Sequence, residues 1–65
     1  MTDLEVLTDS LDEALDVLRR FAYRIEDHYD EGYGTSIIEL DVGEEEALEI
    51  VRVLMERAGI EAKIS

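Results

Sequence analysis

The sequence contains no cysteine and only one histidine and one lysine among its 65 residues. Without cysteine, neither a disulfide framework nor a thiolate metal site can form. A zinc site would have to combine His28 with carboxylates for all its other ligands. No apolar run approaches the roughly 20 residues that a membrane-spanning helix needs. We therefore expect no metal, no cofactor and no association with a membrane.

Met1 to Glu5 contains neither a basic region nor an apolar core, so we expect no secretory signal there. Together with the lack of cysteine, this favours a cytoplasmic location. The hydrophobic fraction of 46% is typical of a globular protein and too high for disorder. A chain of 65 residues is near the lower size limit for folding without help. We expect one domain that covers residues 1–65.

Negative charge dominates the composition. Eighteen Asp and Glu residues outnumber six Lys and Arg residues, which gives a net charge of -12. Phosphate would be repelled, so we expect no direct binding to nucleic acid or to anionic membranes. The charge favours a basic protein as the partner.

The first half of the chain is predicted to form a strand and a long helix. In Asp3–Leu7, alternation places Leu4 and Val6 on one face of a strand. From Leu11 to Tyr29, apolar residues recur at intervals of three and four, which predicts an amphipathic helix of about 20 residues. Its start is marked by Ser10 and Glu13, spaced as a capping box, with Asp9 as the alternative N-cap. Gly32, Tyr33 and Gly34 are then expected to form a turn.

The second half is predicted to form a strand, a helix and a strand. Residues 35–42 alternate as a strand, and Gly43 opens a helix whose apolar stripe continues to Ala58. Gly59 is placed to end this helix as its C-terminal cap. In residues 60–65, Ile60, Ala62 and Ile64 alternate with polar residues as a third strand.

These elements predict an α/β fold, in the form of an α+β two-layer domain with βαβαβ order. Each strand has one apolar and one largely polar face, so both helices should pack on one face of a three-stranded sheet. Two right-handed crossovers favour a parallel sheet of order 1-2-3, although the stretch from Asp27 to Gly34 leaves the direction of the second strand open. The uncovered face would carry Glu5, Leu7, Ile37, Glu39, Asp41, Glu61 and Lys63.

Two groups of residues are candidates for binding a partner. The first is the acidic part of this uncovered face. The second is the acidic run Asp27–Glu31, which the predicted helix places at its C-terminal end, where the helix dipole disfavours negative charge. It is either a solvated helix end, a partner contact or, least well supported by its spacing, a metal site. The candidate partner-binding residues are Glu5, Asp27, Asp30, Glu31, Tyr33, Glu39, Asp41 and Glu61.

Catalytic chemistry has little support in this sequence. General acid–base catalysis needs carboxylates in contrasting environments, whereas nearly every acid here is predicted to face solvent. No histidine is predicted near Ser10 or Ser36. Acids in the first turn of a helix, such as Glu44, Glu45 and Glu46, are explained by the helix dipole. We therefore expect a protein that is not an enzyme.

In size and composition, though through no motif, the chain resembles phage-encoded inhibitors of host defence such as anti-restriction and anti-CRISPR proteins. The resemblance implies a nucleic-acid mimic in the host cytoplasm. Its carboxylates would stand where a basic partner, for example a CRISPR effector subunit, expects phosphates, and would block the DNA-binding groove.

Two other interpretations remain open at this point. A single lysine among so many acids is also typical of proteins from salt-loving organisms, in which case the chain would be a small interaction module with no basic partner. Alternatively, the protein could be a dimeric structural protein that pairs through strand edges or through the face around Ile37. Both a monomer and a homodimer are compatible with the sequence.

Overall fold

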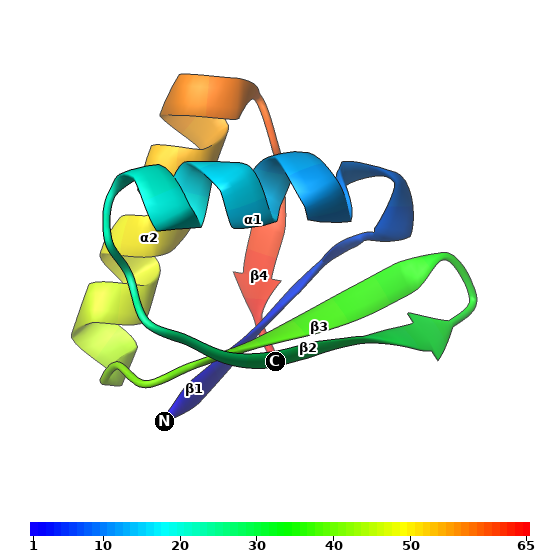
Figure 1. Ribbon diagram of the computed structural model, residues 1–65, viewed down its shortest axis with the longest axis horizontal. Coiled ribbons are helices and arrows are strands. Elements are labelled where there is room, and N and C mark those ends of the chain that lie inside the picture. Colours follow the sequence, from blue (N-terminus) through cyan, green and yellow to red (C-terminus); the bar gives the residue numbers. More distant parts are fainter.

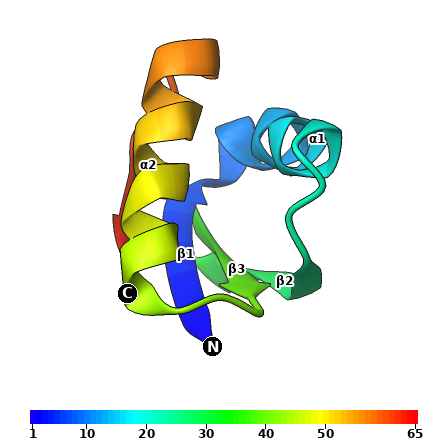
Figure 2. The ribbon, with the colours of Figure 1, turned by 90° about the vertical axis from the view of Figure 1, so that its left-hand side faces the viewer.

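Two helices pack on one face of a four-stranded antiparallel sheet in the computed structural model, which describes all residues 1–65 (Figures 1 and 2). The elements, in chain order, are β1 (Thr2–Leu7), a 3-10 turn η1 (Thr8–Ser10), α1 (Leu11–Arg20), β2 (Ile25–Gly32), β3 (Thr35–Leu40), α2 (Glu44–Ala58) and β4 (Ala62–Ile64). The sheet order is β2-β3-β1-β4. Helix α1 connects β1 to β2, which are parallel to each other and lie on either side of β3. Helix α2 connects β3 to β4 in the same way around β1. This arrangement is the split β-α-β topology.

The structure corrects the predicted fold class. The sheet has four strands rather than three, the order is βαββαβ rather than βαβαβ, and no neighbouring strands are parallel. The error lies in residues 25–32, which form β2 instead of the second half of a long helix. Because this added strand pairs with β3 through a tight hairpin, β3 runs back alongside β1 in the antiparallel sense.

The first helix ends early because of a Schellman motif without glycine. Ala22 has φ 61°. Its N–H donates to the carbonyl oxygen of Arg19 at 3.0 Å, and the N–H of Tyr23 donates to that of Leu18 at 3.0 Å. These two bonds satisfy the last carbonyls of α1 and turn the chain out of the helix. At its other end, Ser10 is the N-cap residue of α1, but its hydroxyl makes no capping hydrogen bond.

The expected turn after this region is confirmed and joins β2 to β3. Tyr33 and Gly34 form a two-residue loop, with φ angles of 59° and 81°. Two successive residues with positive φ are the requirement of a type I′ turn, whose twist matches that of the flanking antiparallel strands. The side chain of Tyr33 is fully exposed at the tip of this hairpin.

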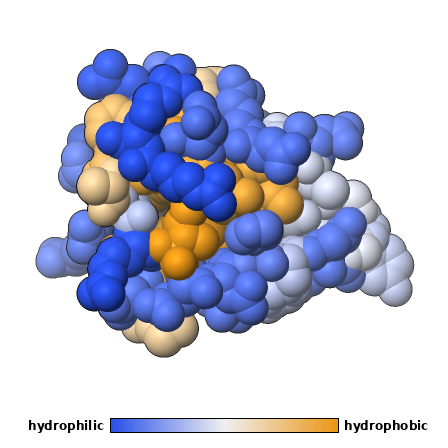
Figure 3. Space-filling view, viewed as in Figure 1, coloured by the Kyte–Doolittle hydropathy of each residue, from blue (hydrophilic) through white to orange (hydrophobic).

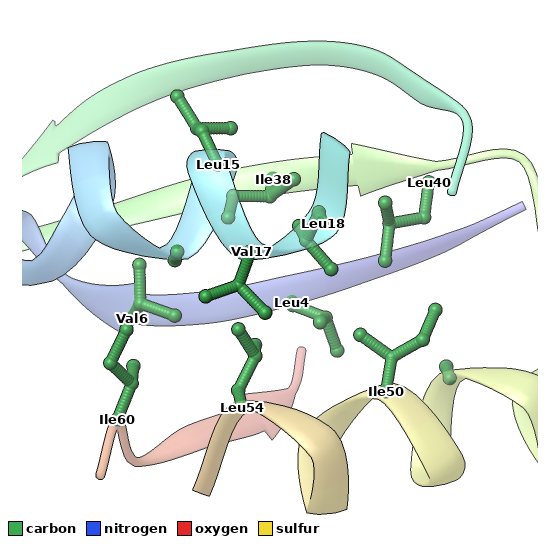
Figure 4. Close-up of a cluster of buried hydrophobic side chains, with 12 residues drawn as sticks. Leu4, Val6, Leu15, Val17, Leu18, Ile38, Leu40, Ile50, Leu54 and Ile60 are labelled. Carbon is green, nitrogen blue, oxygen red and sulfur yellow. The ribbon is translucent and has the colours of Figure 1, made fainter. Parts of the chain in front are cut away.

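The core lies between the sheet and the two helices (Figure 4). Leu4 and Val6 face it from β1, as predicted, and Ile38 and Leu40 face it from β3. The helices contribute Ala14, Leu15, Val17 and Leu18 from α1 and Ala47, Ile50 and Leu54 from α2. Complete burial of a leucine or isoleucine side chain stabilises the fold by about 1.5–3 kcal/mol, so this cluster is the main source of stability.

One polar side chain is fully buried, and it has a partner. Ser36 is 0% exposed on the helix side of β3, and its Oγ lies 2.8 Å from Oγ1 of Thr8.

At the end of α2, Gly59 has φ 65° and acts as the predicted C-terminal cap. In the view of Figure 3, strongly hydrophobic surface is confined to a band between α1 and the β2–β3 hairpin, surrounded by hydrophilic side chains. Neither helix is both long and apolar enough to cross a membrane.

Candidate functional site

The face of the sheet opposite the helices, termed the open face below, carries three rows of side chains. Directly opposed residues in an antiparallel sheet lie on the same face. Since Leu4 and Ile38 point into the core, their strand neighbours point to the open face. The pairing of the strands then assigns to it Asp3, Glu5 and Leu7 of β1, Asp27 and Tyr29 of β2, Thr35, Ile37 and Glu39 of β3, and Lys63 of β4.

Three carboxylates form one of these rows, termed the acid row. Glu39 lies opposite Asp27 on one side and opposite Asp3 on the other. The strands are spaced by about 4.8 Å, so the row crosses three strands within about 10 Å. Like charges directly opposite one another destabilise a sheet, and none of these carboxylates takes part in an ion pair. We therefore expect the acid row to cost folding free energy, because no counter-ion pairs with it.

The neighbouring row is mixed and crosses all four strands. It runs from Tyr29 through Ile37 and Glu5 to Lys63. Nζ of Lys63 lies 3.4 Å from Oε1 of Glu5 and neutralises it. Ile37 is only 2% exposed although it lies outside the main core, because its neighbours in the row cover it. Of the predicted apolar centre at Ile37 and Leu7, Ile37 therefore offers no surface to a partner, whereas Leu7 is 60% exposed.

Tyr29 lies among the carboxylates of the open face. Partial burial raises the pKa of its phenol, and the negative charges of Glu39, Asp3, Glu31 and Asp27 raise it further. About two fifths of the Tyr29 side chain remains exposed, at 43%, so it is accessible from solvent.

The structure brings four of the predicted partner-binding residues to the open face or beside it. Glu5 and Glu39 lie there as expected. Asp27 joins the acid row only because residues 25–32 form a strand, so its predicted place at a helix end is wrong. Glu31 lies beside the face, where its Oε1 accepts a hydrogen bond from Oγ1 of Thr35 at 3.5 Å.

Of the other four predicted residues, Glu61 also borders the open face and three lie elsewhere. Asp30 is opposite Ser36 and so on the helix side of the sheet, where its Oδ1 accepts a hydrogen bond from the N–H of Gly32 at 2.7 Å and shapes the hairpin. Asp41 follows the end of β3 and lies 3.7 Å from a guanidinium nitrogen of Arg24. Glu61 precedes β4 and borders the open face, where it lines a groove together with Glu5 and Lys63. Tyr33 projects from the hairpin tip.

Sequence reasoning missed two residues of the open face, Asp3 and Tyr29. Asp3 was placed on the polar side of its strand, but nothing in the sequence indicated that Glu39 would lie opposite it. Tyr29 was assigned to a helix. Its spacing gives no clear strand signal, because a register shift between Ile25 and Asp27 leaves Ile25 against the core and Tyr29 on the open face.

Most of the positive charge lies on the two helices. The five arginines are Arg19 and Arg20 in α1, Arg24 just before β2, and Arg52 and Arg57 in α2. Only Lys63 stands on the open face. The guanidinium of Arg57 lies over the ring of Phe21, with its Cζ 5.6 Å from the ring centroid. The sheet therefore presents nearly uncompensated negative charge.

The chemistry that this face supports is the binding of cationic groups. No three acidic or histidine side chains are grouped so that they could hold a metal ion. His28 is exposed on β2. Comparison with protein-family models, with curated proteins and with solved structures gives no match. A fold of this kind does not specify a function, so the function has to be inferred from the open face itself.

Proposed function

We propose that this protein is an acidic binding protein that mimics nucleic acid. Its open face would occupy the nucleic-acid-binding groove of a basic partner protein and block that groove by steric competition. A partner of the kind implied by the resemblance to anti-CRISPR and anti-restriction inhibitors is a DNA-binding subunit of a defence complex. The protein itself would carry out no reaction.

The observation that carries this proposal is the acid row. It presents one carboxylate per about 4.8 Å across Asp27, Glu39 and Asp3, while each nucleic-acid strand presents one phosphate per about 3.4 Å of helix axis. A groove lined by Lys and Arg to neutralise phosphates would neutralise such a row as well. Long-range attraction between a chain of net charge -12 and a basic groove also speeds association.

Tyr29 adds a contact that charge alone does not provide. Its ring is partly exposed, and among the carboxylates Glu39 has the strongest effect on its phenol. An arginine of the partner could stack on the ring and bind a carboxylate of the acid row with the same guanidinium group. Tyrosine and arginine are both enriched among the residues that dominate binding energy at protein interfaces.

The experiment is capture of a partner from a bacterial lysate at about 0.1 M salt, followed by elution with a salt gradient. Two triple variants are compared with the wild type, and each removes three negative charges from the net -12. The first, Asp3→Asn with Asp27→Asn and Glu39→Gln, neutralises the acid row. The second, Glu13→Gln with Glu49→Gln and Glu56→Gln, neutralises exposed acids of the helices.

The wild type and the helix variant should retain the same nucleic-acid-binding protein, and competing DNA should release it. The acid-row variant should lose it. Equal loss in both variants would mean that net charge, not the open face, determines binding. A protein that folds only in concentrated salt and captures nothing would instead favour adaptation to salt.

A further inference from the structure

The two edges of the sheet differ in how open they are to another strand. β2 pairs with β3 through two register shifts, and it carries four acidic residues in Glu26, Asp27, Asp30 and Glu31. Bulges and charges of this kind prevent edge-to-edge pairing. β4 pairs with β1 in an unbroken register, and its only charged residue is Lys63.

The backbone of β4 has hydrogen-bonding groups that point away from the sheet. The N–H of Ser65 donates to the carbonyl oxygen of Asp3 at 2.9 Å. In an antiparallel ladder the hydrogen-bonded pairs alternate along the strand. It follows that Lys63 bonds toward β1, whereas the N–H and C=O groups of Ala62 and Ile64 point outward, where no strand of this chain accepts them.

Helix α2 exposes an apolar stripe along the same edge. Leu48 and Met55 are 57% and 46% exposed, and Val51 lies between them at helical spacing. A groove of about 350 Å³ separates this stripe from the start of β4 and is lined in part by Val51, Met55, Ala62 and Leu7. Since about half of Leu48 and of Met55 is exposed, a neighbouring molecule could bury them.

Two basic residues lessen the repulsion between two like-charged chains at this edge. Lys63 neutralises Glu5 at a distance of 3.4 Å, and Arg52 follows Val51 on the exposed side of α2. Glu61 is the one acid of the groove lining that makes no ion pair. At about 0.15 M salt, charges farther apart than about 8 Å are largely screened. Lys63 and Arg52 thus reduce the repulsion between two copies that meet at this edge.

We propose that the protein forms a two-fold symmetric homodimer through antiparallel pairing of its β4 edges. Ala62 would lie opposite Ile64 of the second copy, and the α2 stripes around Leu48 and Met55 would pack side by side. The two Lys63 side chains would face each other, each already paired with its own Glu5. Such a two-fold axis is perpendicular to the sheet, so both helix layers remain on one side and both acid rows on the other.

The size of the surface sets the expected strength. A standard interface buries about 800 Å² per partner, which is roughly a fifth of the 4211 Å² exposed by this chain. The short β4 and the single apolar stripe supply a smaller contact. We therefore expect a dissociation constant in the micromolar range.

The test is sedimentation equilibrium from about 10 µM to about 500 µM protein at about 0.15 M and about 0.5 M salt. The wild type should approach twice its monomer mass of 7.4 kDa. Leu48→Gln with Met55→Gln should weaken the dimer at least tenfold by removing apolar contact. Ala62→Pro should do the same, because it removes an outward N–H that makes no bond within the chain. Tyr33→Gln, at the distant hairpin tip, is the control and should leave the dimer intact.

Circular dichroism first establishes that each variant is folded. A wild type that stays monomeric at every concentration and salt would overturn the proposal, as would a dimer that neither edge variant weakens. The acid row lies outside this edge, so loss of the dimer would leave the proposed binding function untouched. Conversely, failure to capture a partner would not affect the dimer.

Discussion

Glu39 of β3 lies directly opposite Asp27 of β2, and neither carboxylate makes an ion pair. Asp3 of β1 faces Glu39 from the other side. The chain has six basic residues, but none of them pairs with these carboxylates. A repulsive contact that is maintained in the middle of the sheet is expected where the charge serves a partner.

Glu39→Gln should stabilise the free protein. It removes repulsion toward Asp27 and Asp3 at once, and cross-strand pairs contribute about 0.2–1 kcal/mol each. We expect an increase of about 0.5 kcal/mol in the free energy of unfolding at low salt. The gain should decline toward zero at about 1 M salt, where the screening length is only about 3 Å. Urea denaturation at both salt concentrations measures it.

Glu56→Gln is the matched control, because it removes the same charge from the exposed face of α2. Its effect should be smaller than that of Glu39→Gln. If the two substitutions stabilise the protein equally, the acid row has no special electrostatic cost.

The ionisation of Tyr29 reports on the same carboxylates. Partial burial, and after it the charge of Glu39, raise the pKa of its phenol above the ordinary value. Glu39→Gln should therefore shift this pKa back toward about 10. Carbon NMR of the ring measures the shift, with Tyr23 as an internal reference. An unchanged pKa in the Gln variant would place Glu39 too far from the ring to act on it.

The raised pKa also predicts how stability changes at high pH. As the pH rises past about 10, tyrosine ionises first in the unfolded chain, which then binds fewer protons than the folded one. The free energy of unfolding should therefore fall until the native phenol ionises as well. Tyr29→Phe should remove this part of the loss in denaturation curves between about pH 8 and about pH 11. An identical loss in the Phe variant would contradict the assignment.

Ala22→Gly should stabilise the protein, because Ala22 has φ 61° at the end of α1. Glycine adopts this conformation without the roughly 1–2 kcal/mol penalty of other residues. We expect a gain of about 1 kcal/mol, or about 4–8 °C in Tm. If residues 11–29 formed one continuous helix, the same change would cost about 1 kcal/mol. A fall in Tm would therefore contradict the end of α1 before Ala22. Ala22→Val, which worsens the strain, should lower Tm.

This residue also explains why part of the fold could not be predicted. The sequence marks β1, β3 and α2 clearly, because Leu4 and Ile38 follow the alternation of a strand and Gly59 marks a helix end. The face of α2 was predicted less well, since Leu48 and Met55 of the expected apolar stripe are exposed and the flanking Ile50 is buried. At Ala22 no glycine marks the end of α1. Beyond it, Ile25 and Tyr29 fit a helix and a strand equally well. Only tertiary pairing with β3 decides between them.

The candidate site was predictable to the same extent. Alternation within one strand places Glu5 and Glu39 on the polar face, and both lie there. The acid row itself depends on which strands are neighbours and in what register. Register is set by the hairpin turn and by burial. The sequence predicts a helix, not a strand, before the turn at Tyr33 and Gly34, so it predicts no hairpin there. Asp27 could therefore not be placed opposite Glu39.

Thr8→Val should destabilise the protein through its effect on Ser36. The hydroxyl of Ser36 is completely buried, and its hydrogen bond to Thr8 at 2.8 Å would be lost. An unpaired buried hydroxyl costs about 1–3 kcal/mol. The double variant Thr8→Val with Ser36→Ala removes both polar groups and should recover most of this loss. Thermal denaturation of the three proteins tests it, and a double variant no more stable than Thr8→Val would contradict it.

The most direct test of the central claim is an NMR titration of the isotopically labelled protein with a short peptide rich in Arg and Lys. The largest amide shifts should occur at the acid row and Tyr29, and the triple variant Asp3→Asn with Asp27→Asn and Glu39→Gln should abolish them. Shifts centred instead on the first turn of α2, at Glu44, Glu45 and Glu46, or spread evenly over the acidic surface, would contradict the claim that the open face is built to receive a basic partner.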